Sequence, residues 1–321
     1  MLRPLLIVGL LLGAALALAA ALLAGSMTID WPAALPGSDP AARTILFELR
    51  LPRALSAFGC GALLALSGAL MQVLLRNPLA DPYILGISGG SAVAALSATV
   101  LGLAAWWIPF GAFVGALVST LLVFALAHRQ GPWTTERLIL TGVALASGWG
   151  AAISFVLSIA PDKDLRGMIF WLMGDLSHAD APALACLSAL IGLTAAWLLA
   201  RDLNVLSRGE ATATSLGVDT RRLRNAIFVL SAGMTAVAVS VGGTLGFVGL
   251  VVPHAVRFLI GSDNRWVLPA SALLGGTLLV VADTLARTVL APQQLPVGVV
   301  TAFIGVPTFL FLLQRGYRRQ C

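Results

Sequence analysis

The chain has 321 residues, of which 59% are hydrophobic and only 11% charged, and its mean hydropathy is +0.94. Soluble domains carry about 25% charged residues, so this chain has too little polar surface to cover a water-soluble fold. The formal charge of +6 is distributed among the connections between apolar runs, which argues against a nucleic-acid partner. The composition therefore excludes a soluble domain and indicates an integral membrane protein with lipid around it.

Apolar runs of the length that crosses a bilayer, about 20 residues, recur along the whole chain. The first run follows Arg3 and resembles a secretory signal peptide, but the many later runs favour a retained first helix. The predicted spans are Leu5–Gly25, Ala54–Leu75, Leu85–Trp107, Phe110–Ala127, Leu138–Ala160, Pro182–Ala200, Ala226–Val248, Gly249–Ile260, Val267–Leu290 and Pro296–Leu313. The sequence thus predicts an all-α membrane protein with about ten transmembrane helices.

The eighth predicted span, Gly249–Ile260, is the shortest, and it contains Pro253, His254 and Arg257. We expect a half-helix that is held by protein rather than by lipid. With this span included, the inner connections hold 14 of the 20 Lys and Arg residues and the outer ones hold 6. Both termini are therefore predicted to be cytoplasmic. The spans are rich in small residues and no linker divides them, so we expect one compact bundle over residues 1–321.

The longest inner connection, residues 201–224, carries the signals of a short helix outside the membrane. Ser207 and Glu210 fit a capping box, Gly217 suits a helix C-terminus, and Asp219 can cap the following helix. A solvated loop that only holds positive charge is the alternative. A structured helix at about residues 207–218 would offer a docking place to a partner protein.

Two groups of charges mark the outer side. Arg50 and Arg53 flank Pro52 at the predicted start of the second span, where the helix dipole disfavours cations, so an acidic outer partner is one explanation and headgroup contact the other. Asp283 and Arg287 stand four residues apart and fit an intrahelical ion pair. Asp283 is also the only carboxylate well inside an apolar run, which disfavours a proton-driven secondary transporter because such proteins usually need relays of buried acids.

Motifs for covalent chemistry are weak in this chain. Ser88 in a G-x-S-G pattern and His254 together resemble the dyad of a rhomboid intramembrane protease, but so short a motif is expected by chance here. The only lysine, Lys163, follows Asp162, so no phosphate-binding loop is present and any ATP must be hydrolysed by another chain. The three cysteines show no metal-ligand spacing. We predict no catalytic residue, no metal and no cofactor bound by this chain.

Several motifs together resemble one family, the FecCD/BtuC-like permease subunits of type II ABC importers for ferric siderophores, haem and vitamin B12. The resemblance extends from residue 50 to the end of the chain. The matching segments are Arg50-Leu-Pro-Arg53, Gly68-Ala-Leu-Met-Gln72, Arg76-Asn-Pro-Leu-Ala-Asp-Pro82, Leu85-Gly-Ile-Ser88, Ser215-Leu-Gly-Val218, Gly246-Phe-Val-Gly-Leu250, Pro253-His254, Ala282-Asp283, Leu295-Pro-Val-Gly298 and Thr301-Ala302.

The resemblance implies a permease of ten helices that works as a homodimer, with two cytoplasmic ATP-binding subunits and a periplasmic substrate-binding protein. It implies that Arg50, Arg53 and Arg287 receive acidic residues of the binding protein. Many members carry Glu before the Leu-Pro-x-Gly motif, where this chain has Gln294, so an outer carboxylate contact there is in doubt. The residues implied to contact the ATPase are Ser207, Arg208, Gly209, Glu210, Ala211, Ser215, Leu216, Gly217 and Val218.

We therefore predict a multi-pass protein of the cell inner (plasma) membrane that imports an iron chelate, a ferric siderophore or haem, with ATP hydrolysed on a partner subunit. Vitamin B12 (cobalamin) import by the same mechanism is the alternative. Nothing in the residues distinguishes these substrates or identifies the residues that line or gate the pathway. A secondary transporter and an intramembrane protease are the alternatives from other classes.

Overall fold

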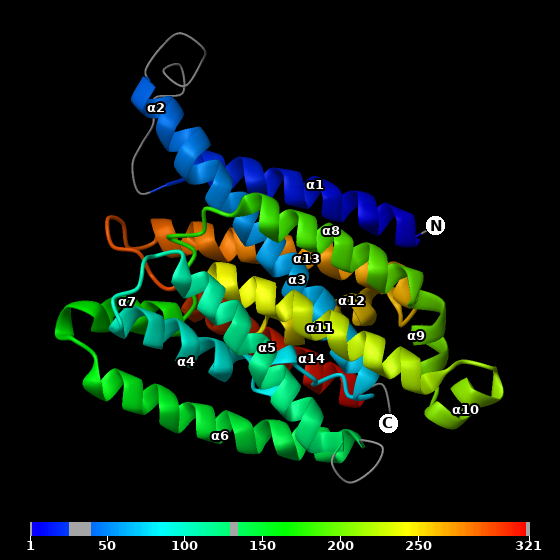
Figure 1. Cartoon of the computed structure of the whole chain (residues 1–321). Coiled ribbons are helices and arrows are strands. Elements are labelled where there is room, and N and C mark those ends of the chain that lie inside the picture. The colour runs from blue at the N-terminus through cyan, green and yellow to red at the C-terminus, as the bar shows by residue number, and fades with distance from the viewer. Residues whose placement is uncertain (1, 26–39, 129–133, 319–321) are drawn as a thin grey trace.

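The structure is a computed structural model that describes residues 2–25, 40–128 and 134–318 (Figure 1). Within these ranges every regular element is a helix. The α-helices are α1 (Leu2–Leu23), α2 (Pro40–Thr44), α3 (Leu51–Leu74), α4 (Ile87–Val100), α5 (Trp107–His128), α6 (Thr135–Ile159), α7 (Asp162–Leu172), α8 (Pro182–Leu198), α9 (Ala200–Leu206), α10 (Glu210–Ser215), α11 (Thr220–Gly242), α12 (Val248–Ile260), α13 (Asn264–Thr288) and α14 (Val297–Arg318). A π-helix, η2 (Ile45–Arg50), joins α2 to α3, and a 3₁₀-helix, η3 (Pro82–Leu85), precedes α4.

The predicted all-α membrane fold is confirmed. In the described part of the chain, six helices are long and apolar enough to cross a membrane, namely α1, α3 with its leading segment, α5, α6, α11 and α13. A seventh span is the pair α8 and α9, which bend by 59° at their junction, and α4, α12 and α14 are shorter apolar helices. These segments correspond one to one, in chain order, with the ten predicted spans.

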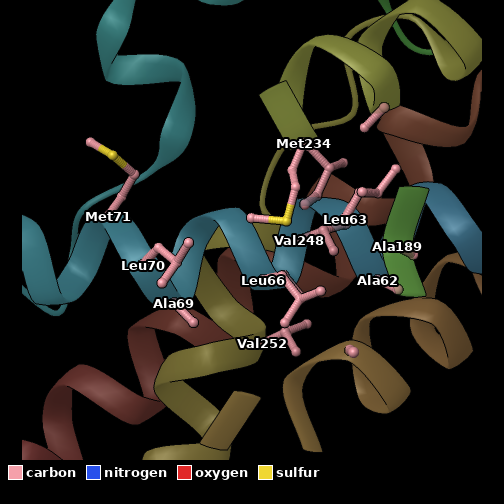
Figure 2. Close-up of a cluster of buried hydrophobic side chains, with 14 of the residues drawn as sticks. Ala62, Leu63, Leu66, Ala69, Leu70, Met71, Ala189, Met234, Val248 and Val252 are labelled. Atoms are coloured by element: carbon pink, nitrogen blue, oxygen red, sulfur yellow. The ribbon is translucent and has the colours of Figure 1, made fainter. Parts of the chain in front are cut away.

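Helix α3 forms the centre of the bundle. It packs against α13, α11, α8 and α12, and its apolar length is almost entirely covered by protein (Figures 1 and 2). Glycines allow this close approach: a Cβ built on Gly61 would lie 2.2 Å from the carbonyl oxygen of Gly275 in α13. A Cβ on Gly68 would lie 1.9 Å from the oxygen of Gly249 in α12. Close contact between the backbones increases the van der Waals packing that holds helices together in lipid.

Three helices, α6, α11 and α13, have polar caps at their first turns. The side chains of Thr134, Asp219 and Asp263 accept hydrogen bonds from backbone amides at the starts of α6, α11 and α13, at 3.3, 3.0 and 3.1 Å. Each satisfies an amide that the helix leaves without a partner. The cap at Asp219 was predicted from the sequence and is confirmed.

The two ends of the bundle carry different polar groups. At one end, Arg3 of α1 lies 3.6 Å from Asp263, which caps α13. Helix α10, the start of α1 and the end of α14 lie at the same end (Figure 1). This is the end that the charge distribution assigns to the cytoplasm. At the opposite end, α3 and α13 meet through Arg53 and Asp283. We refer to these as the inner and the outer end.

Candidate functional site

At the inner end, the predicted helix outside the membrane is present but starts later than predicted. The capping box at Ser207 is wrong: this residue ends α9, and its hydroxyl donates to the Leu203 carbonyl oxygen at 2.8 Å. The N-cap of α10 is Gly209, whose φ of 122° favours a residue without a side chain. A serine next to a helix end can bond backward as well as forward, and sequence spacing alone does not decide which.

The C-terminus of α10 follows the prediction. Gly217 has a φ of 81°, and the Val218 amide donates to the Ala213 carbonyl oxygen at 3.0 Å, as in a Schellman motif. Asp219 then starts α11, so the chain reverses within a few residues. This turn fixes the direction of α10 relative to α11.

Helix α10 is attached to the bundle at two points. Glu210 receives Arg224 of α11 in an ion pair at 3.0 Å, and Ala213 is fully buried. Leu216 is 65% exposed, which leaves a large apolar side chain uncovered among polar neighbours. Of the predicted contact residues, Ser207, Arg208, Glu210, Ala211, Ser215, Leu216 and Gly217 are exposed, and Gly209 and Val218 are half-buried. The arrangement presents a fastened surface element to a partner.

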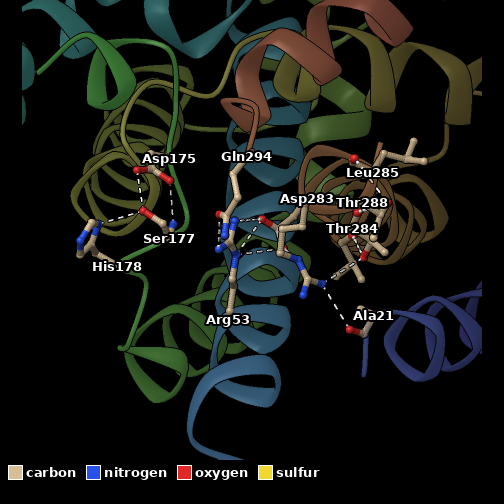
Figure 3. Close-up of polar contacts among 12 residues, drawn as sticks. Ala21, Arg53, Asp175, Ser177, His178, Asp283, Thr284, Leu285, Thr288 and Gln294 are labelled. Carbon is tan, nitrogen blue, oxygen red and sulfur yellow. Dashed lines mark hydrogen bonds and ion pairs between the residues drawn. The ribbon is translucent and has the colours of Figure 1, made fainter. Parts of the chain in front are cut away.

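At the outer end, one buried carboxylate holds two arginines (Figure 3). Asp283 of α13, 1% exposed, lies 2.8 Å from Nη2 of Arg53 and 3.0 Å from Nε of Arg287, one turn further along α13. The intrahelical pair predicted for Asp283 and Arg287 is confirmed. The link to Arg53 was not predicted, although a lone carboxylate in an apolar run near several arginines is a signal for such a partner.

The same cluster reaches the end of α1. Arg50 donates from Nη1 to the carbonyl oxygens of Leu22 at 2.8 Å and Leu23 at 3.1 Å, and Arg287 donates to that of Ala21 at 3.2 Å. A helix C-terminus has carbonyl groups without intrahelical partners and a partial negative charge, so cations are stabilised there. Arg50 and Arg287 are each 5% exposed as a result, whereas the Arg53 side chain is 12% exposed.

The dipole argument for Arg50 and Arg53 is wrong in its premise. The helix does not begin at Pro52 but at Pro40, and it passes through η2 into α3, so the two arginines lie within continuous helix. The Leu51 amide bonds to the Leu46 oxygen, five residues back. Pro52 has no amide hydrogen, and in a regular α-helix a proline ring clashes with the carbonyl group four residues back. The wider π turn just before Pro52 accommodates the ring. The arginines are stabilised by Asp283 and α1 instead.

Gln294 occupies the place where many members of the resembled family carry Glu, and it has a defined contact here. Its Oε1 accepts a hydrogen bond from Nη1 of Arg53 at 3.1 Å (Figure 3). Arg53 and Arg287 share the carboxylate of Asp283, so these three residues carry a net charge of +1, and Arg50 lies beside them on the carbonyl oxygens of α1. A surplus of this sign suits an acidic partner.

The residues of the protease hypothesis are not brought together. Ser88 starts α4, which packs against α5 and α6, whereas His254 lies in α12, which packs against α3, α13 and α14. In the described ranges the structure records no hydrogen bond between them. His254 therefore has no contact with the serine that the protease hypothesis requires it to activate. His178, at the outer end, bonds through Nδ1 with the hydroxyl of Ser177 at 2.9 Å (Figure 3).

A lipid-embedded helical bundle with an exposed, fastened helix at its inner end defines a multi-pass membrane protein with a structured helix outside the membrane. A model of the FecCD transport family matches residues 5–315. The chain belongs to this family.

Relatives agree with that assignment. The hemin transport system permease protein HmuU of Yersinia pestis is 43% identical over 84% of this chain and 83% of its own length. The cobalamin import system permease protein BtuC of Halobacterium salinarum is 42% identical over 90% and 79%. A solved metal-chelate type ABC transporter in an inward-facing conformation matches with a TM-score of 0.88, at 31% identity, over 97% of this chain and 99% of that one. This chain is accordingly an ABC importer permease, a multi-pass protein of the inner membrane.

Proposed function

We propose that this permease imports an iron chelate, a ferric siderophore or haem, into the cytoplasm, and that ATP hydrolysis on a separate partner subunit drives it. The similarity to a hemin permease and to a metal-chelate type transporter supports this substrate class. Cobalamin import by the same mechanism is the second candidate, because the cobalamin permease BtuC is similar at nearly the same identity.

The observation that carries the ATP-driven mechanism is the geometry of α10. The helix is fastened to α11 by the pair Glu210–Arg224 and continues from α9, which itself bends from α8 by 59°. A push on its exposed Leu216 would therefore be passed to two spans at once. We assign residues 207–218 as the contact for the ATP-binding subunit. ATP is bound by that subunit, and this chain needs no cofactor of its own.

The proposed assembly is a homodimer of the permease with two ATP-binding subunits at the inner end and a periplasmic binding protein at the outer end. Alternating access then follows: closure of the ATP-binding subunits moves α10, and the bundles rock to open on one side at a time. The binding protein contacts Arg50, Arg53 and Arg287, and the net positive charge of Arg53, Arg287 and Asp283 suits acidic residues. Arg53 is the most exposed of the three and would be met first.

Transport by the reconstituted assembly tests the proposal. The permease, its cognate ATP-binding subunit and binding protein are placed in vesicles, and uptake of haem, a ferric siderophore and cobalamin is compared. We expect vanadate-sensitive uptake of an iron chelate. A preference for cobalamin would change the proposed substrate from an iron chelate to cobalamin and would leave the proposed mechanism unchanged. Uptake by the permease alone that an uncoupler abolishes would refute ATP-driven import and indicate a secondary carrier.

The contact at α10 is tested by Leu216→Asp, with Leu216→Met as the matched control. The aspartate variant should lose ATP-driven uptake, because an apolar contact becomes charged, while thermal stability is unchanged since the side chain is exposed. The methionine variant should keep uptake. If Leu216→Asp kept full ATP-driven uptake, α10 would not be the contact through which the ATP-binding subunit acts.

Docking at the outer end is tested by the double variant Arg50→Glu/Arg53→Glu, with Arg43→Glu, an exposed residue of α2, as the control. Binding-protein affinity should fall in the double variant and not in the control. If the double variant is unstable, Arg53→Gln gives the same comparison with a smaller charge change. Unchanged affinity in a folded variant would reject the docking assignment.

A further inference from the structure

A cavity of about 200 Å³ lies at the inner end, beside the base of α10. It is formed where α3 ends, where α9 ends, and where α12 passes into α13. Its lining residues are Gln72, Val73, Arg76, Asn77, Pro78, Ser207, Arg257 and Ser262. The cavity opens to the surface, because Arg76 and Pro78 are exposed.

The lining contains two cations and no carboxylate. Arg257 of α12 donates from Nη2 to the carbonyl oxygen of Ala69 at 3.1 Å and from Nη1 to Oε1 of Gln72, both of them neutral acceptors. Arg76 makes no side-chain hydrogen bond or ion pair with any residue in the described ranges. Arg257 is half-buried, whereas Arg76 stays in contact with water. A cation partly withdrawn from water without a counter-ion is costly, and in membrane proteins such groups mark functional sites.

Two acidic residues near this end, Asp263 and Glu210, are engaged by other groups. Asp263 accepts from the side chain of Asn204 at 2.7 Å and lies 3.6 Å from Arg3. Glu210 holds Arg224. In the described part of the chain, no carboxylate lines the cavity or forms an ion pair with Arg76 or Arg257.

The backbone sets Arg76 at the mouth of the cavity. Its φ is 47°, in the left-handed region, and the next residue, Asn77, donates from its amide to the Gln72 carbonyl oxygen at 3.1 Å, which closes the end of α3. A Cβ on Gly209 would lie 4.0 Å from Nη1 of Arg76. The guanidinium group therefore lies between the cavity and the first residue of the α10 turn.

We propose that this cavity binds an oxyanion of the phosphate type between Arg76 and Arg257. Guanidinium groups match phosphate oxygens well, and Asn77 and Ser262 supply neutral hydrogen-bond donors. The volume equals roughly seven water molecules in the liquid, enough for a phosphate group with some of its hydration. Because the cavity lies where helices end, the phosphate can come from an anionic lipid headgroup or from free inorganic phosphate.

A bound phosphate would connect the α3–η3 loop with α12 directly beside α10. This is a ligand site in addition to the proposed transport function, and its existence does not depend on that function. Its test accordingly needs neither transport substrate nor ATP.

The experiment uses the purified full-length permease. The thermal shift is measured in delipidated detergent solution with increasing inorganic phosphate, against chloride at equal ionic strength. It is also measured in nanodiscs of phosphatidylcholine with and without phosphatidylglycerol. The variant is Arg76→Gln, because Arg76 has no internal contact to lose, and the control is Arg265→Gln, an exposed arginine at the same end that does not line the cavity.

We expect saturable stabilisation of the wild type and of Arg265→Gln, and apparent affinity about tenfold weaker in Arg76→Gln, which loses a charged donor. A response to inorganic phosphate identifies the free ion as a source, and a response to phosphatidylglycerol alone identifies the headgroup. Absence of any response in both arms would overturn the proposal. An equal loss in Arg265→Gln would do the same, because it would show general charge screening.

Discussion

Removal of the Asp283 carboxylate gives a direct test of the outer cluster. In Asp283→Asn the side chain keeps its shape, but Arg53 and Arg287 lose their only shared negative charge while Arg287 stays buried. The two guanidinium groups then repel one another. We expect the variant to be markedly less stable than the wild type, with the outer ends of α1, α3 and α13 loosened first.

The magnitude follows from the geometry. At an effective dielectric constant of about 20, two unit charges 3 Å apart attract by roughly 5 kcal/mol, and the cost of burying them offsets part of this. Loss of one partner of a buried pair typically costs about 3–5 kcal/mol. At roughly 2 °C per kcal/mol, the apparent melting temperature should fall by about 6–10 °C.

The assay is thermal unfolding in detergent or nanodiscs, followed by intrinsic tryptophan fluorescence. Asp162→Asn, an exposed acid at the start of α7, is the control and should change little. The double variant Asp283→Asn/Arg53→Gln should recover part of the loss, because one unpaired cation is gone. A melting temperature of Asp283→Asn within 2 °C of the wild type would refute the assignment of the cluster as a stabilising contact.

Three further predictions concern packing, coupling and pH. Gly68→Ala should prevent folding or lower thermal stability strongly, because its Cβ would lie 1.9 Å from the Gly249 oxygen and force α3 and α12 apart. Glu210→Gln should lower ATP-driven uptake while it costs less than about 1 kcal/mol of stability, since the pair with Arg224 is at the surface. Burial raises the pKa of Asp81, in the α3–η3 loop, to about 6, so the native state binds this proton more tightly than the unfolded chain. Stability should therefore fall as pH rises from about 4 to about 6, by up to about 3 kcal/mol.

Each of these has a matched comparison. Gly148→Ala, with nothing within 4 Å of the added Cβ, should be neutral or slightly stabilising, and equal effects at the two glycines would contradict the packing argument. Unchanged uptake in Glu210→Gln would show that the ion pair does not transmit motion. Asp81→Asn should remove the part of the pH dependence between pH 4 and pH 6. The comparison uses curves of melting temperature against pH for the variant and the wild type. If the two curves stay parallel, Asp81 is not the titrating group.

The spans were predictable from the sequence because bilayer thickness sets a minimum length for apolar runs. The short helix α12 was also predicted from its apolar run. Pro253 and Arg257 within that run distinguished it from the neighbouring spans. The extension of α3 back to Pro40 was not predicted. Pro52 looks like a helix start, and only the structure shows that a π turn lets the helix continue through it.

The polar contacts between distant segments were the least predictable part. The pair Asp283–Arg287 follows from spacing of four residues, but Arg53 lies 230 residues from Asp283 in the chain, and only packing of α3 on α13 brings them together. Ser207 was misassigned for a related reason: its hydroxyl has acceptors and donors within reach on both sides, and the choice depends on where α9 ends.

The glycine contacts of α3 restrict how the protein moves. Where Gly61 meets Gly275 and Gly68 meets Gly249, backbone touches backbone, and there is no clearance for one helix to slide or turn against the other. We therefore expect α3, α12 and α13 to move together during a transport cycle. The motion of α10 would reach this centre through α8 and α11, both of which pack on α3.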